Sequence, residues 1–197
     1  MNELIVLGFD GFAKAVIDSA RGMNKYDSIV ILDKKDNLEK EFADSKVVGT
    51  LDELHDYYGK GYRFVYIANE NDMEWRKEVA KKAKDIGFSF ATIIDVSADI
   101  SPEATIGDGT YVGKGCVVGP CVSIGENVIL DTGSIIQSGS SIGNLSRVCT
   151  RGITEYDVKI GDMCYIGVTS VVVKNTEVPD NTTVADVSVY GKQFFEE

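Results

Sequence analysis

The chain has 197 residues, enough for one large domain or two small ones that each bury a core. Its 31 acidic residues outnumber the 20 basic ones, and the net charge of -11 repels a phosphate backbone, which excludes nucleic acid as an expected partner. The sequence has no apolar run of about 18 residues, and its start lacks the basic segment and cleavage site of a signal peptide. We therefore expect a cytoplasmic protein with no membrane insertion.

The cysteines and the single histidine give no sign of a metal site. Cys116, Cys121, Cys149 and Cys164 form no CxxC motif and have no histidine nearby, so neither a zinc site nor a redox pair is indicated. We expect free thiols and no bound metal. His55 lies in a predicted helix near the middle of the first hundred residues, where a surface position is expected.

Residues 1–95 alternate strand-like and helix-like segments, which predicts a parallel α/β domain. In chain order we expect a strand at 3–9, a helix at 12–22, a strand at 28–35, a helix at 50–58, a strand at 63–69, a helix at 73–87 that closes on a glycine, and a strand at 88–94 leading out of the domain.

A short glycine-rich turn joins the first predicted strand to the first helix. Gly8 and Gly11 would let backbone N–H groups approach a diphosphate at the helix N-terminus, with Phe9 between them. Asp33, at the end of the second strand, stands where an acidic residue meets a ribose or a base edge. A plain turn and a solvated carboxylate are the alternative interpretations, because the motif is shorter than a full dinucleotide fingerprint.

From Ile100 onwards the sequence period becomes six, and the register never slips. Every sixth residue is aliphatic except Thr154, a small side chain stands two residues before most of them, and glycine often follows. This is the hexapeptide repeat of a parallel β-helix, in which three repeats make one coil of 18 residues with the aliphatic side chains inside. The aliphatic column is Ile100, Ile106, Val112, Val118, Ile124, Leu130, Ile136, Ile142, Val148, Ile160, Ile166, Val172, Val178 and Val184.

The segments "LGFDGFAKAVID", "VILDKK" and "ISPEATIGDGTYVGKGCVVGPCVSIGENVILDTGSII" together resemble the bacterial sugar acetyltransferases of the NeuD and PglD type. The resemblance covers nearly the whole chain. It implies a Rossmann-like domain at 1–95 that binds a nucleotide-activated sugar, a left-handed β-helix at 96–189 that forms a homotrimer, and a tail at 190–197. It also implies that acetyl-CoA lies between neighbouring β-helices.

The residues of this chain depart from the family pattern where the chemistry is expected. The family's general base is a histidine flanked by carboxylates, and the matching positions here are Gln137, Ser138 and Gly139. A second family histidine falls on Arg147, and a third, where the domains join, falls on Asp95. Phe12 also replaces a histidine that the family usually carries.

Two carboxylates could replace the missing base. One coil beyond the corner with Ser138, the 18-residue period places Glu155, Tyr156 and Asp157, and a desolvated carboxylate can act as a base. A solvated corner is the alternative, and the ring of Tyr156 stands where the family has small residues that leave room for the CoA arm. We expect the cofactor-binding positions to be Arg147, Gly152, Tyr156, Gly167 and Lys174.

Two hypotheses follow. The first is an acetyl-CoA-dependent acyltransferase acting on a nucleotide-activated amino sugar in bacterial surface polysaccharide or glycan synthesis. N-acylation is favoured over O-acylation because an amine needs less help from a base than a hydroxyl does. The second is a family member that has lost catalysis and serves as a nucleotide-sugar binding or assembly subunit.

Overall fold

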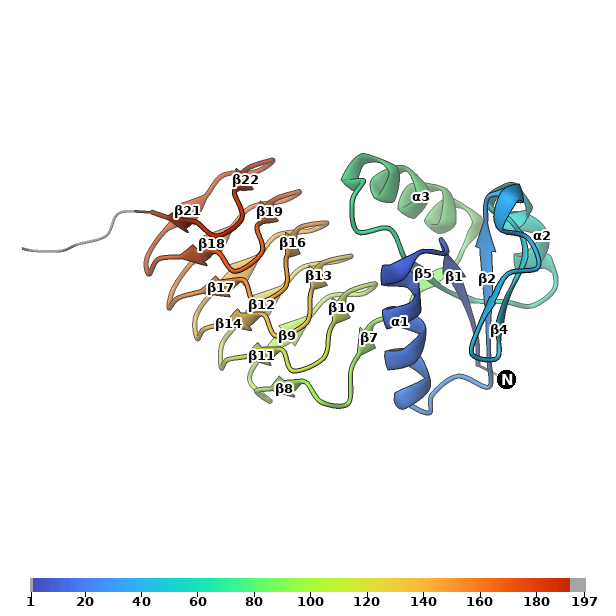
Figure 1. The fold of residues 1–197 in the computed structure, drawn as a ribbon, viewed down its shortest axis with the longest axis horizontal. Helices are drawn as coiled ribbons and strands as arrows, with labels where there is room; N and C mark the ends of the chain where they lie inside the picture. Colours follow the sequence, from blue (N-terminus) through green and yellow to red (C-terminus); the bar gives the residue numbers. More distant parts are fainter. Residues whose placement is uncertain (1, 192–197) are drawn as a thin grey trace, which may run out of the picture. The chain divides into compact units, whose positions relative to one another are not determined.

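The computed structural model describes residues 2–191 and divides the chain into two compact units, Met1–Ile94 and Asp95–Glu197. The first unit is an α/β domain (Figure 1). Its helices are α1 (Gly11–Gly22), η1 (Lys35–Asn37), η2 (Leu51–Glu53), α2 (Leu54–Gly59) and α3 (Met73–Ile86). Its strands are β1 (Glu3–Leu7), β2 (Ser28–Asp33), β3 (Glu41–Phe42), β4 (Ser45–Thr50), β5 (Phe64–Ile67) and β6 (Ser89–Phe90).

These strands form sheet A, in the order β3-β4-β2-β1-β5-β6. All the neighbouring pairs are parallel except the short β3–β4 pair. The order reverses at β1, whose neighbours are β2 and β5, and this is the strand arrangement of a Rossmann-like domain. The expected strands and helices of this unit are therefore present, with β3 and β4 as additions that the periodicity analysis missed.

The helix ends of this unit follow from local side-chain chemistry. Asp10 caps α1 by accepting a hydrogen bond from the Ala13 N–H at 2.9 Å, and Asp72 caps α3 by accepting one from the Trp75 N–H at 2.9 Å. Gly87 ends α3 in the left-handed conformation, at φ 112°, as the sequence predicts.

The predicted strand at 88–94 is interrupted. Its first half is β6, at the edge of sheet A, and its second half is β7 (Ile93–Ile94), which pairs in a sheet of the β-helix.

The second unit is a β-helix whose two-residue strands stack into three parallel sheets, here called B, C and D (Figure 1). Sheet B contains β7, β10 (Tyr111–Val112), β13 (Ile129–Leu130), β16 (Arg147–Val148), β19 (Tyr165–Ile166) and β22 (Thr183–Val184). Sheet C contains β8 (Asp99–Ile100), β11 (Val117–Val118), β14 (Ile135–Ile136), β17 (Ile153–Thr154), β20 (Val171–Val172) and β23 (Val189–Tyr190). Sheet D contains β9 (Thr105–Ile106), β12 (Ser123–Ile124), β15 (Ser141–Ile142), β18 (Lys159–Ile160) and β21 (Glu177–Val178).

The register confirms the 18-residue coil. Val112 pairs with Leu130, Leu130 with Val148 and Val148 with Ile166, and all four side chains are buried. The corners between strands carry a left-handed residue every sixth position, for example Gly133, Gly139 and Leu145. Tyr190, assigned to the tail by the sequence analysis, pairs with Val172, and residues 192–197 of that tail lie outside the described residues.

The small side chains inside the coils connect one coil to the next. The Thr110 hydroxyl donates to the Gly125 carbonyl at 2.9 Å and accepts from the Val128 N–H at 3.1 Å. Ser140 and Ser146 make the same pair of bonds 15 and 18 residues further along the chain. The column of small residues therefore satisfies buried backbone groups as well as saving space.

Thr154 gives a stability prediction, because it breaks the aliphatic column inside the β-helix. Its side chain is fully buried, and its Oγ1 has no hydrogen-bond partner among residues 2–191. Replacing it with valine, which has the same shape, removes an unsatisfied hydroxyl, so Thr154→Val is expected to stabilise the protein by about 1 kcal/mol. Chemical denaturation measures this change.

Thr110→Val is the matched control for that prediction. It removes a hydroxyl that makes two buried hydrogen bonds, so it is expected to destabilise by about 1–2 kcal/mol. Equal effects of the two substitutions would contradict the assignment of Thr154 as an unsatisfied group.

Within the described residues, no helix is long and apolar enough to cross a membrane. The same residues contain no cluster of three His, Cys, Asp or Glu side chains placed to hold a metal ion. All four cysteines are free thiols, and only Cys121 is exposed.

Candidate active site

The residues expected to replace the family's base lie at the corner that leads from sheet C to sheet D. The Asp157 N–H donates to the Ser138 carbonyl at 3.1 Å, and the Asn175 N–H donates to the Tyr156 carbonyl at 3.1 Å. Ser138, Tyr156 and Lys174 therefore follow one another on successive coils, as the sequence arithmetic predicts.

The side chains at this corner offer carboxylates and no imidazole. Glu155 is half-buried, and its Oε2 accepts a hydrogen bond from the Lys174 N–H at 2.8 Å. Asp157 is exposed and sits at a left-handed corner, at φ 57°. Its Oδ1 would lie 2.3 Å from a Cβ built on Gly139, so only glycine fits there. The ring of Tyr156 is 54% exposed.

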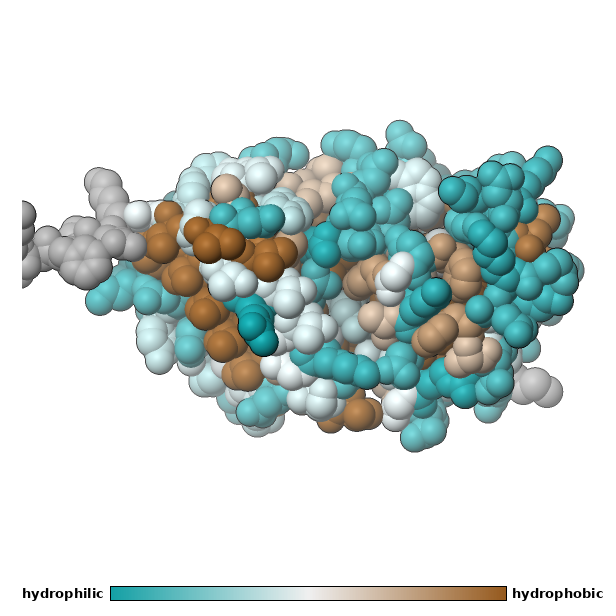
Figure 2. Space-filling view, viewed as in Figure 1, coloured by the Kyte–Doolittle hydropathy of each residue, from teal (hydrophilic) through white to brown (hydrophobic). Residues whose placement is uncertain are grey.

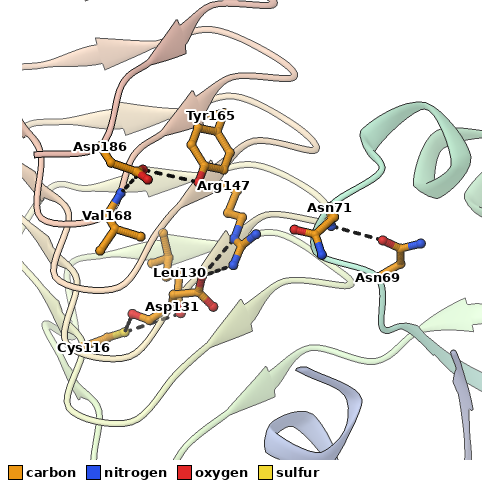
Figure 3. Close-up of polar contacts among 9 residues, drawn as sticks. All are labelled: Asn69, Asn71, Cys116, Leu130, Asp131, Arg147, Tyr165, Val168 and Asp186. Atoms are coloured by element: carbon orange, nitrogen blue, oxygen red, sulfur yellow. Dashed lines mark hydrogen bonds and ion pairs between the residues drawn. The ribbon is translucent and has the colours of Figure 1, made fainter. Parts of the chain in front are cut away.

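A second polar cluster lies on the outer surface of sheet B (Figure 3). Arg147 Nε and Nη2 both donate to Asp131 Oδ2, at 2.8 and 2.7 Å, and the exposed fractions of the two side chains are only 14% and 10%. The guanidinium carbon lies 5.9 Å from the ring centroid of Tyr165, one coil further on. Asp131 and Tyr165 therefore fix the orientation of Arg147.

Neutral groups complete the cluster. A hydrogen bond with Cys149, assisted by burial, raises the pKa of Tyr165 to about 12, and burial raises the pKa of the Cys149 thiol. Tyr165 Oη also donates to Asp186 Oδ1 at 3.5 Å, and Asp186 accepts from the Val168 N–H at 2.8 Å. At neutral pH, Tyr165 and Cys149 are therefore protonated, so neither acts as a base.

One chain does not bring all the expected cofactor-binding residues together. Tyr156 and Lys174 belong to the corner between sheets C and D, whereas Arg147 lies on sheet B, the opposite side of the three-sided coil. Gly152 and Gly167 are buried, and a Cβ on either would press on neighbouring atoms at 2.8 and 2.5 Å. Both glycines therefore have a packing role in the chain itself.

In the first unit, the two glycines of the turn differ sharply. Gly8 is buried at φ 115°, and a Cβ there would lie 2.4 Å from the Ala68 carbonyl oxygen, whereas a Cβ on Gly11 would meet nothing within 4 Å. Lys14 Nζ lies 5.6 Å above the ring of Phe9, beside the N-terminus of α1. Phe12 is buried and its ring lies 6.4 Å from that of Tyr66.

Asp33 is half-buried at the end of β2, where its Oδ2 accepts a hydrogen bond from Asn37 Nδ2. It lines a cavity of about 500 Å³ together with Asn69 and Trp75. His55 is exposed on α2, as expected for a surface residue.

Sequence analysis missed Asp131, Tyr165 and the aromatic wall given by Trp75. A signal for Tyr165 exists in the repeat, because it lies 18 residues after Arg147. The partnership of Asp131 with Arg147 depends on a side chain reaching across coils, which the period alone does not specify.

Family models match both halves of the chain. The PglD N-terminal domain matches residues 3–83, and the bacterial transferase hexapeptide (six repeats) matches residues 103–136. No curated protein sequence matches the chain.

Solved structures extend this likeness to almost the whole chain. Perosamine N-acetyltransferase from Caulobacter crescentus, as a histidine-to-asparagine variant with CoA and GDP-perosamine, is 26% identical with a TM-score of 0.78, covering 93% of each chain. The acetyltransferase domain of PglB from Neisseria gonorrhoeae is 25% identical with a TM-score of 0.73, covering 94% of this chain and 97% of that one. Caulobacter crescentus PerB with CoA and GDP-perosamine is 25% identical with a TM-score of 0.75, covering 93% and 94%.

A Rossmann-like domain followed by a left-handed β-helix of hexapeptide repeats defines the class of protein as a hexapeptide-repeat acyltransferase. Within that class, the chain is a NeuD/PglD-like sugar acetyltransferase. The resemblance drawn from the sequence is confirmed at the level of fold and enzyme class.

Proposed function

We propose that this chain transfers the acetyl group of acetyl-CoA to an amino group on a nucleotide-activated sugar, in the synthesis of a bacterial surface polysaccharide or glycan. The observation that carries the proposal is the match across 93% of the chain to an N-acetyltransferase holding CoA and GDP-perosamine. In the reaction the amine nitrogen bonds to the thioester carbonyl carbon, the C–S bond breaks, CoA leaves as a thiolate, and the amine gives up a proton.

The chemistry of the corner supports an amine as the acceptor. A sugar hydroxyl needs a base worth about 10²- to 10⁴-fold, whereas part of an amine is already unprotonated near neutral pH. Positioning the amine against the thioester then supplies most of the acceleration. We assign Glu155 and Asp157 as candidates to accept the amine proton, with Ser138 in the place of the family's histidine.

Arg147, Gly152, Tyr156, Gly167 and Lys174 are proposed as CoA-binding positions, and Gly8, Phe9, Gly11 and Asp33 as positions that bind the nucleotide sugar. Arg147 and Lys174 carry the cations suited to CoA phosphates. The buried pair with Asp131 supports this role for Arg147, because a guanidinium held in one orientation loses little freedom when it binds an anion.

A homotrimer would bring the two halves of this site together. The outward side chains of sheet C form an apolar ladder in register, and hydrophobic colour crosses the stack of coils in Figure 2. Sheet D instead presents Thr105, Ser123, Ser141, Lys159 and Glu177. A neighbouring copy packed on the ladder would remove its apolar surface from water. The ladder is Val117, Ile135, Ile153, Val171 and Val189.

The ladder gives a prediction about assembly. Placing a charge in its centre, as Ile153→Lys, is expected to reduce the mass in solution from three chains to one chain of 21.4 kDa, because burying an unpaired ammonium is costly. Light scattering after gel filtration measures the mass. Ser141→Lys on sheet D is the control and is expected to leave the trimer intact, so dissociation of both variants would contradict the assignment of this interface.

Release of the CoA thiol from acetyl-CoA tests the activity. Thiol release is expected only when a nucleotide-linked 4-amino sugar is present, and Glu155→Gln or Asp157→Asn is expected to lower kcat by about tenfold or more. Ser138→Ala is the control and should change kcat little, since the serine hydroxyl is a poor base.

The second candidate function, a nucleotide-sugar binding or assembly subunit, is favoured by Gln137, Ser138 and Gly139 standing where the family has its base, and by the Tyr156 ring at the corner. Nucleotide-sugar binding without measurable acetyl-CoA binding in a calorimetric titration would establish it and overturn the acetyltransferase proposal.

A further inference from the structure

The cavity at the carboxyl ends of the strands in sheet A has the size and position of a nucleoside site. Asp33 ends β2, Thr50 ends β4 and Asn69 lies just beyond β5, and all three line the same cavity of about 500 Å³. Ligands of open α/β sheets bind outside these strand ends, in pockets of about 300–1,000 Å³. Trp75, at the start of α3, adds an aromatic side chain to the wall, suited to contact with the face of a base.

The polar groups of this cavity present an oriented carboxylate. Asn37 Nδ2 donates to Asp33 Oδ2, and Lys40 Nζ donates in turn to Asn37 Oδ1 at 2.6 Å. Asp33 is therefore held from one side, and its carboxylate can accept further hydrogen bonds from a ligand. Lys34 and Lys35, which line the same cavity, add N–H donors beside it.

The four common bases differ in what they offer such a carboxylate. Guanine has two adjacent donors on one edge, N1–H and the exocyclic N2–H, with the O6 acceptor beside them. Uracil places a single N–H between two carbonyl oxygens, which a carboxylate repels. Adenine and cytosine each pair one amino donor with a ring nitrogen that accepts. Guanine alone matches an acceptor-only group flanked by ammonium donors.

We infer that this cavity takes the guanine of a guanosine-diphosphate sugar, with the Asp33 carboxylate accepting from N1–H and N2–H and a lysine ammonium donating to O6. The inference rests on the proposed function for its sugar-diphosphate part and adds the identity of the base. It assigns Asp33 to the base edge, in place of the ribose contact that its position at the end of β2 also allows.

Calorimetric titration of the full chain with GDP, UDP and ADP tests the preference. A two-point hydrogen-bonded base contact is worth about 10- to 100-fold, so GDP is expected to bind at least tenfold more tightly than UDP or ADP. Equal affinity for GDP and UDP overturns the inference without any variant being needed.

Asp33→Asn separates a base contact from a ribose contact. An amide N–H opposes guanine N2–H but pairs with the C2 carbonyl of xanthine, so the variant is expected to lose GDP affinity about tenfold or more and to gain affinity for xanthosine diphosphate. Loss of GDP and UDP alike, with no gain for xanthosine diphosphate, places Asp33 on the ribose and overturns the inference. Asp36→Asn, an exposed neighbour outside the cavity lining, is the control and should leave all affinities unchanged.

The outcomes keep this inference distinct from the proposed function. A GDP preference without thiol release from acetyl-CoA supports the base assignment and contradicts acetyl transfer. Thiol release with a UDP-linked amino sugar as the better substrate supports acetyl transfer and contradicts the base assignment.

Discussion

Gly8→Ala is expected to destabilise the N-terminal unit by about 3–4 kcal/mol, a large effect for the addition of one methyl group. The alanine would have to adopt φ 115°, and its Cβ would lie 2.4 Å from the Ala68 carbonyl oxygen. Ala68 follows β5, and its N–H donates to the Leu7 carbonyl at 2.8 Å, so the carbonyl has little freedom to move. The thermal transition of this unit is expected to fall by more than about 10 °C, measured by calorimetry.

Gly11→Ala is the matched comparison within the same turn. A Cβ at this position meets nothing within 4 Å, and Gly11 opens α1, where alanine favours the helix. Its stability is expected to change by less than about 0.5 kcal/mol. A similar loss for both variants would show that the turn is sensitive to any side chain, contrary to the close approach described at Gly8.

Removing Arg147 is expected to have the second largest effect. Arg147→Met takes from Asp131 a partner that donates twice to one carboxylate oxygen, in a pair that is nearly nine-tenths buried, and is expected to cost about 2–4 kcal/mol. The double variant Arg147→Met with Asp131→Leu removes both charges and is expected to recover much of that stability. Denaturation of the two single variants and the double variant gives the coupling energy of the pair.

The same variants separate structure from substrate binding. If Arg147 contacts the CoA phosphates, the double variant regains stability but keeps a raised KM for acetyl-CoA. A double variant that regains both stability and wild-type KM would restrict the ion pair to a structural role in the outer surface of sheet B.

The β-helix was predictable almost to the residue, because its period repeats the same steric condition at every coil. Each buried position tolerates only an aliphatic or small side chain, so the column from Ile100 to Val184 is visible without any structure. The α/β unit was predictable for its long elements, whereas β3 and β4 are short and sit at the edge of sheet A, where fewer buried side chains mark a strand.

The site was less predictable than the fold. Stacking arithmetic placed Ser138 beside Asp157 because both follow the coil, but the Arg147–Asp131 pair depends on a long side chain that reaches back to a corner of the preceding coil. The cavity beside Asp33 combines residues from four separate segments of the first unit. No local pattern in the sequence records such a convergence.

The three sheets of the β-helix have a consequence for how this protein can change. Each coil contributes one outward side chain to each sheet, so the sequence carries three interleaved records, each read once in 18 residues. A substitution in one record alters a single surface of the prism and leaves the other two, and the interior, untouched. Contact with another copy, exposure to water and contact with a ligand can therefore be adjusted separately, by point substitutions alone, without refolding the scaffold that supports them.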